Sequence, residues 1–101
     1  MPRRDQIEAM LKDDPDDTFL NYALAKELVS AGDVGAAIAA FDRVLRLDSD
    51  YVPAYFQKAQ ALAGEGETKA ARDVLIQGID VAQRVGDSHA AGEMTAFLDT
   101  L

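Results

Sequence analysis

The stretch AGDVGAAIAAFDRVLRLDSD, residues 31–50, decides the fold. Gly32 and Asp33 precede a run of small residues, and large apolar residues follow from Phe41 onward. Glycine tolerates the left-handed backbone that ends many helices, and aspartate is a preferred helix N-cap. The stretch therefore predicts a helix that stops at Gly32 and a new helix over 34–47. A helix alone does not explain why its first turns carry only small side chains.

A second copy of this pattern, EGETKAARDVLIQGIDVAQR, begins at residue 65, so each of its positions lies 34 residues after its equivalent. Gly32 meets Gly66 in this alignment, and Ala37 meets Ala71. A fixed period of about 20 to 50 residues is typical of solenoids built from stacked units. The small residues then have a purpose, because they let two helices of a pair approach closely while larger residues fill the next layer.

On these residues the sequence resembles the tetratricopeptide repeat family, whose repeat is about 34 residues long. The resemblance implies an all-α, right-handed superhelix of antiparallel helix pairs with about six helices. The positions that match the family pattern, which we expect to be repeat-packing residues, are Leu24, Ala25, Leu28, Gly32, Ala37 and Phe41 in one unit and Tyr55, Ala59, Leu62, Gly66, Ala71 and Leu75 in the next.

The resemblance also implies one domain over residues 1–101. Within it we expect a partial repeat at 1–17, full repeats at 18–51 and 52–85, and a capping helix at 86–101. Several positions depart from the family pattern: Asn21 replaces a large apolar residue, Lys58 a leucine, Val44 and Gly78 an alanine, and Ser49 and Gln83 a proline. The shared period supports both repeats despite these departures.

Helix start and stop signals divide the chain into six segments. The predicted helices cover about 4–13, 18–31, 34–47, a segment with Pro53 in its first turn, 68–85 and 88–101. Gly86 and Asp87 repeat the stop-and-cap pattern before the last of them.

Composition agrees with a helical fold and limits the chemistry. The 101 residues are 49% hydrophobic but only 7% aromatic, with no Trp and no Cys. A core of Ala, Leu, Val and Ile favours helices, and the absence of cysteine excludes disulfides and thiolate metal sites.

The net charge of −8, from 18 acidic and 10 basic residues, disfavours nucleic acid and anionic membranes as partners. Two explanations of the acidity stay open: aspartates used as helix caps, or a surface adapted to high salt. No apolar segment approaches the roughly 20 residues of a membrane span, and the N-terminus lacks a secretory h-region. We therefore expect a cytoplasmic protein.

Nothing in the sequence indicates catalysis, a cofactor or a metal. His89 is the only histidine, with Glu93 as its helical neighbour, so a His-based metal site is disfavoured. The acidic run at 13–17 lacks the glycine and glutamate positions of an EF-hand loop and is better explained by helix capping. We expect a non-enzymatic protein.

In the family that the chain resembles, the first helix of each pair lines a concave groove that binds a peptide. Carried over by position, the groove candidates are Phe19, Tyr22, Lys26 and Val29, then Phe56, Gln57 and Gln60, with Met94 from the last helix. Tyr22 and Phe56 have an alternative role, which is simple packing between helices.

Relatives that hold a chaperone's C-terminal carboxylate use Lys and Asn at set groove positions. Tyr22, Lys26, Asp87 and Ala91 depart from that set, so an acidic tail is disfavoured and an apolar or basic segment is expected. Two alternatives to peptide binding stay open: self-association as a structural homo-oligomer, or a regulatory subunit of an enzyme. The expected state is a monomer or weak homo-oligomer.

Overall fold

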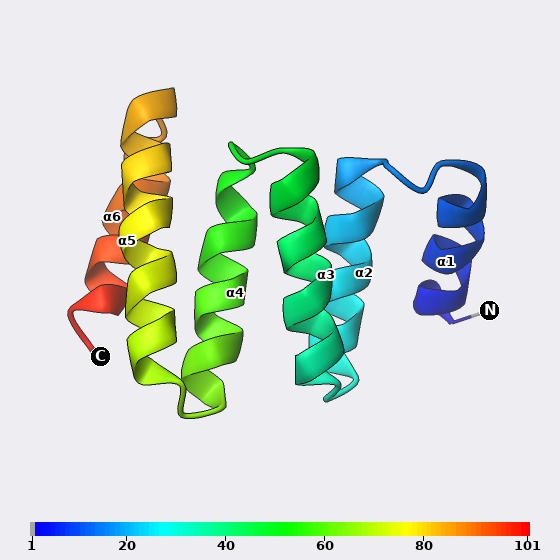
Figure 1. Ribbon diagram of the computed structural model, residues 1–101, viewed down its shortest axis with the longest axis horizontal. Coiled ribbons are helices and arrows are strands. Elements are labelled where there is room, and N and C mark those ends of the chain that lie inside the picture. Colours follow the sequence, from blue (N-terminus) through cyan, green and yellow to red (C-terminus); the bar gives the residue numbers. More distant parts are fainter. Residues whose placement is uncertain (1) are drawn as a thin grey trace. The chain divides into compact units, whose positions relative to one another are not determined.

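The computed structural model describes residues 2–101, which form six α-helices and no strand (Figure 1). The helices are α1 (Arg3–Asp13), α2 (Thr18–Ser30), α3 (Val34–Leu47), α4 (Val52–Gly64), α5 (Thr68–Val85) and α6 (Ser88–Leu98). The all-α prediction is confirmed, although the last helix ends at Leu98 rather than at residue 101. None of the described helices is long and apolar enough to cross a membrane.

The chain divides between Ser49 and Asp50 into two compact units, one with α1 to α3 and one with α4 to α6. In the first unit α2 packs against both α1 and α3, and in the second unit α5 packs against both α4 and α6. The division falls close to the predicted repeat limit at residue 51. The assignment of residues 1–101 to one domain, with the repeat limits given above, stays a prediction.

Fully buried alanines mark both antiparallel pairs, α2–α3 and α4–α5 (Figure 1). Ala25 and Ala37 are inaccessible in the first pair, as are Ala59 and Ala71 in the second. The other apolar packing candidates are buried (Leu28, Phe41, Tyr55, Leu75) or half-buried (Leu24, Leu62). Small side chains at these positions allow the helices to approach closely, and larger ones fill the adjoining core.

The turns between helices follow from glycine and aspartate. A positive φ occurs at Gly32 (80°), Gly66 (79°) and Gly86 (83°), where any side chain would strain the backbone. A carboxylate caps the following helix by accepting the N–H three residues on, at 2.8 Å for Asp17, 3.4 Å for Asp33 and 3.0 Å for Asp87. These local choices fix where α2, α3 and α6 begin.

Asn21, which departs from the family pattern, is buried with its polar atoms satisfied. Its Nδ2 donates to the carbonyls of Pro15 (3.0 Å) and Asp17 (2.8 Å), and its Oδ1 accepts from Arg43 Nε (3.2 Å). Arg43 also donates to the Pro15 carbonyl (3.0 Å) and to Asp16 Oδ1 (2.7 Å). This network ties the turn before α2 to α3, a role that an apolar residue at position 21 cannot fill.

Gly78 lies on α5 in close contact with side chains of both α4 and α6. A Cβ at this position would lie 2.6 Å from Tyr55 Cβ and 2.7 Å from Met94 Sδ. Real carbon contacts are not that short, so the alanine of the family pattern does not fit here. The glycine makes room for Tyr55 of α4 and Met94 of α6, which both pack against α5 at this point.

Gly78→Ala should therefore lower the free energy of unfolding by about 1–3 kcal/mol, because overpacking a core forces its neighbours apart. Gly92→Ala is the matched control, since a Cβ at Gly92 meets nothing within 4 Å. In the interior of α6 it should raise the free energy of unfolding by about 0.5–1 kcal/mol. Urea denaturation followed by circular dichroism measures both, and shifts of the same sign would contradict this account of Gly78.

Candidate functional site

The predicted groove residues of α2 form a partly exposed face. Phe19 is 62% exposed, Val29 and Lys26 are also exposed, and Tyr22 is half-buried. The Tyr22 ring lies 6.0 Å from the Phe41 ring, between centroids, at a tilt of 55°. Lys26 Nζ lies 5.8 Å from the centroid of the Tyr22 ring, within cation–π range. Tyr22 thus both packs onto α3 and contributes to the surface.

On α4, Phe56 has the same double role. Its ring lies 6.0 Å from the Phe97 ring, between centroids, with a tilt of 53°. It is half-buried, as is Gln57, whereas Gln60 is exposed. Phe56 and Gln57 line a hollow between α4 and α6, and Gln60 does not belong to it.

This hollow has a volume of about 230 Å³ and lies within the second unit. Four apolar and four polar residues line it: Val52, Pro53, Phe56 and Ala90, and Gln57, Asp87, His89 and Glu93. Small-molecule sites usually measure about 300–1,000 Å³, so the α4–α6 hollow is better matched to one large side chain of a peptide.

The α4–α6 hollow carries negative charge. Asp87 and Glu93 line it, and no Lys or Arg is among its described lining residues. His89 Nε2 lies 3.2 Å from Glu93 Oε1, with both side chains largely in solvent. Asp87 Oδ1 accepts a hydrogen bond from the N–H of Ala90, and this bond holds the carboxylate at the start of α6. An apolar lining beside carboxylates is suited to an apolar side chain next to a cation.

The sequence-based prediction for Met94 is wrong. This residue was expected to form a wall of the groove, but its side chain is fully buried and its sulfur lies next to Gly78. The prediction carried positions forward by 34 residues, whereas α6 begins 36 residues after α4 (Ser88 after Val52). Two residues turn a helix by about 200°, so the expected face points the opposite way.

The α6 residues that line the hollow, namely His89, Ala90 and Glu93, were not predicted as site residues. Their spacing places them on one helix face, and the Asp87 cap fixes where that helix starts. Those two signals identify the face, but not the helix that packs beside it. Among residues 2–101, no group of three or more His, Cys, Asp or Glu side chains is placed to hold a metal ion.

Comparison with known proteins identifies the family to which this chain belongs. The tetratricopeptide repeat family matches residues 28–92. A TPR repeat-containing protein of Pseudomonas aeruginosa is 32% identical over 95 residues, covering 94% of this chain and 90% of that protein. The chain belongs to the tetratricopeptide repeat family.

Solved structures agree with this tetratricopeptide repeat assignment. A tetratricopeptide repeat domain protein from Salinibacter ruber is 30% identical, with a TM-score of 0.81, over 85% of this chain and 87% of that one. The type III secretion chaperone SycD of Yersinia enterocolitica, in complex with a peptide of the translocator YopD, has a TM-score of 0.74 at 16% identity. That match covers 92% of this chain and 77% of SycD and concerns the fold alone.

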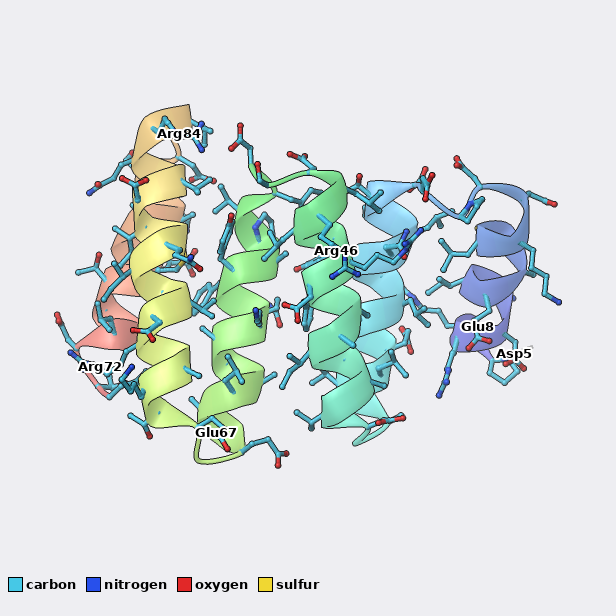
Figure 2. The ribbon with its side chains drawn as sticks, in the orientation of Figure 1. Asp5, Glu8, Arg46, Glu67, Arg72 and Arg84 are labelled. Carbon is cyan, nitrogen blue, oxygen red and sulfur yellow. The ribbon has the colours of Figure 1, made fainter. Side chains whose placement is uncertain are left out.

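An ion pair joins the end of α5 to Asp50 in the turn before α4, the helix whose first turn supplies Val52 and Pro53 to the hollow. Arg84, near the C-terminal end of α5 (Figure 2), donates from Nη2 to Asp50 Oδ1 at 2.6 Å and from Nη1 to Oδ2 at 3.5 Å. The hydrogen bond from Arg84 holds the pKa of the Asp50 carboxyl below its ordinary value, and the carboxylate in turn raises the pKa of Arg84.

The lowered pKa of Asp50 gives a pH prediction. Since the folded value lies below the unfolded value of about 3.9, the pair stabilises the fold at neutral pH, and this contribution is lost as pH falls through the folded value. An NMR titration of the Asp50 carboxyl should show its pKa rising toward the ordinary value in Arg84→Gln. Lys69→Gln, which removes a cation paired with Asp73 on the same helix, should leave it unchanged. An Asp50 pKa insensitive to Arg84→Gln would contradict the assignment.

Proposed function

We propose that this tetratricopeptide repeat chain is a non-enzymatic interaction protein that binds a peptide or helix of a partner protein through the α4–α6 hollow. The observation that carries the proposal is the composition of the hollow, in which a half-buried Phe56 lies beside the carboxylates of Asp87 and Glu93. One apolar side chain of the partner enters the 230 Å³ space, and its neighbours in sequence contact the acidic residues.

The family relationship supports this reading. SycD, a protein of the same fold, is bound to a peptide of YopD. The hollow of this chain lies on two of its own helices, α4 and α6, and two of the groove residues carried over from the family, Phe56 and Gln57, line it. A binding role therefore uses surface that the fold already provides.

The chemistry of the partner follows from charge. The chain has a net charge of −8, and the hollow adds two carboxylates without a lining cation. A segment in which Lys or Arg adjoins a large apolar residue matches both properties, whereas an acidic segment would be repelled. The preferred ligand is therefore an apolar-basic peptide.

The α2 face is a separate candidate contact surface in the other unit. It comprises the groove residues carried over to that helix, namely Phe19, Tyr22, Lys26 and Val29. Phe19 is its strongest candidate anchor, since large exposed aromatics are common at protein interfaces. Gln60 is exposed on α4 but does not line the hollow.

We expect the protein to act in the cytoplasm. Neither a cofactor nor a catalytic step enters the mechanism, which consists of docking and release. Affinity depends on how much apolar surface the partner buries and how well it is preorganised.

Selection from a display library of random short peptides tests the proposal. Peptides recovered with the native chain should pair a large apolar residue with Lys or Arg. Their affinity, measured by fluorescence anisotropy, should fall at least about tenfold in Ala90→Phe, because the new ring fills the hollow. This substitution leaves the net charge unchanged, so a loss of binding reports shape rather than general attraction between charges.

Ala39→Phe is the matched control, since Ala39 is exposed on α3 and does not line the hollow. It should bind the selected peptides as the native chain does. Equal binding by Ala90→Phe and the native chain, with native circular dichroism in both, would refute the hollow as the binding site. Recovery of acidic peptides would refute the proposed partner chemistry.

A further inference from the structure

A second hollow, of about 580 Å³, runs along a different face of α6. Residues of that helix line it at intervals of three or four, from Ser88 through Ala91, Gly92 and Thr95 to Ala96, and the C-cap residue Asp99 continues the row. The hollow thus extends along the whole helix, and no other helix of the second unit fills it. Its length and shape match a helix lying alongside α6.

The exposed face of α1 has the features to fill it. Met10 is 54% exposed, although the equivalent residues 34 and 68 positions later, Val44 and Gly78, are buried in their helix pairs. Arg3 and Met10 share one face of α1 because seven residues make about two turns, and Gln6 and Asp13 lie on the same side. All four residues are exposed.

The two faces are complementary in an antiparallel arrangement, the one used by the α2–α3 and α4–α5 pairs (Figure 1). Arg3 and Met10 are seven residues apart, as are Asp99 and Gly92. With Arg3 beside Asp99, Met10 therefore enters the hollow at Gly92, where no side chain fills the space. In the same register Gln6 falls near Ala96.

Arg3 is available for such a contact. It pairs with Glu27 at 3.0 Å, but its side chain remains 69% exposed, and a guanidinium has further N–H donors. A cation beside Asp99 also lies at the C-terminal end of α6, where the helix dipole favours positive charge. The pairing of Arg3 with Asp99 and the entry of Met10 at Gly92 thus favour the same antiparallel register of α1 and α6.

We propose that the α6 hollow binds α1 of a second copy of this chain. The contact is head-to-tail, because it joins two different surfaces. A dimer therefore keeps one free α6 hollow, on the copy whose α1 is bound, and one free α1 face, on the other copy. It uses neither Phe56 nor Ala90, so it is independent of the peptide-binding proposal.

Sedimentation analysis of two variants tests this contact. Met10→Glu blocks the α1 face, and Gly92→Arg fills the α6 hollow. The native chain should show an average mass that rises with concentration, and each variant alone should remain a monomer. A mixture of the two variants should form a dimer and nothing larger, because only one intact face of each kind remains.

Ile76→Glu is the control, since Ile76 is 56% exposed on α5 and lies outside the hollow. It should associate as the native chain does. A native chain that stays monomeric at all accessible concentrations would overturn the proposal, as would a mixture of the blocked variants that fails to dimerise.

A charge exchange tests the register. Arg3→Asp and Asp99→Arg should each weaken association of the chain, and the double variant Arg3→Asp/Asp99→Arg should restore it. A double variant that associates no better than the single ones would overturn the antiparallel pairing of Arg3 with Asp99.

Discussion

Close approach of helices at fully buried alanines is the constraint on which the rest of the structure depends. Ala25 and Ala37 are inaccessible in the α2–α3 pair, and Ala59 and Ala71 in the α4–α5 pair. With so few aromatic residues, the chain obtains its core from tight packing of small and aliphatic side chains rather than from large rings. Several of its rings, among them Phe19 and Phe56, consequently remain at least partly accessible for binding.

The departures from the family pattern are compensated locally. Asn21 replaces a large apolar residue, but its amide and Arg43 together satisfy the carbonyls of the turn before α2. Gly78 replaces an alanine because Tyr55 and Met94 occupy the space a methyl group would need. These two exceptions therefore support the same packing as the residues that follow the pattern.

Much of the local structure was predictable because it depends on neighbours in sequence. The turn glycines, the Asp17, Asp33 and Asp87 caps and the approximate limits of α1, α2, α3 and α5 follow from short signals and from the repeat period. The site was less predictable. The period of 34 residues fails before α6, which begins 36 residues after α4, and so Met94 was assigned to the surface although it is part of the core. The Gly86 and Asp87 signal marks where α6 begins, but which side chains of α6 border α4 depends on packing between the helices, and no short signal encodes that packing.

The central claim is that the α4–α6 hollow holds an apolar side chain of a basic peptide. Intermolecular NOEs in an NMR sample of the isotope-labelled chain with a selected peptide test it most directly. The account predicts NOEs from one apolar side chain of the peptide to the Phe56 ring and to the methyl group of Ala90. NOEs confined to α3 or to the outer face of α5, with none to Phe56 or Ala90, would contradict it.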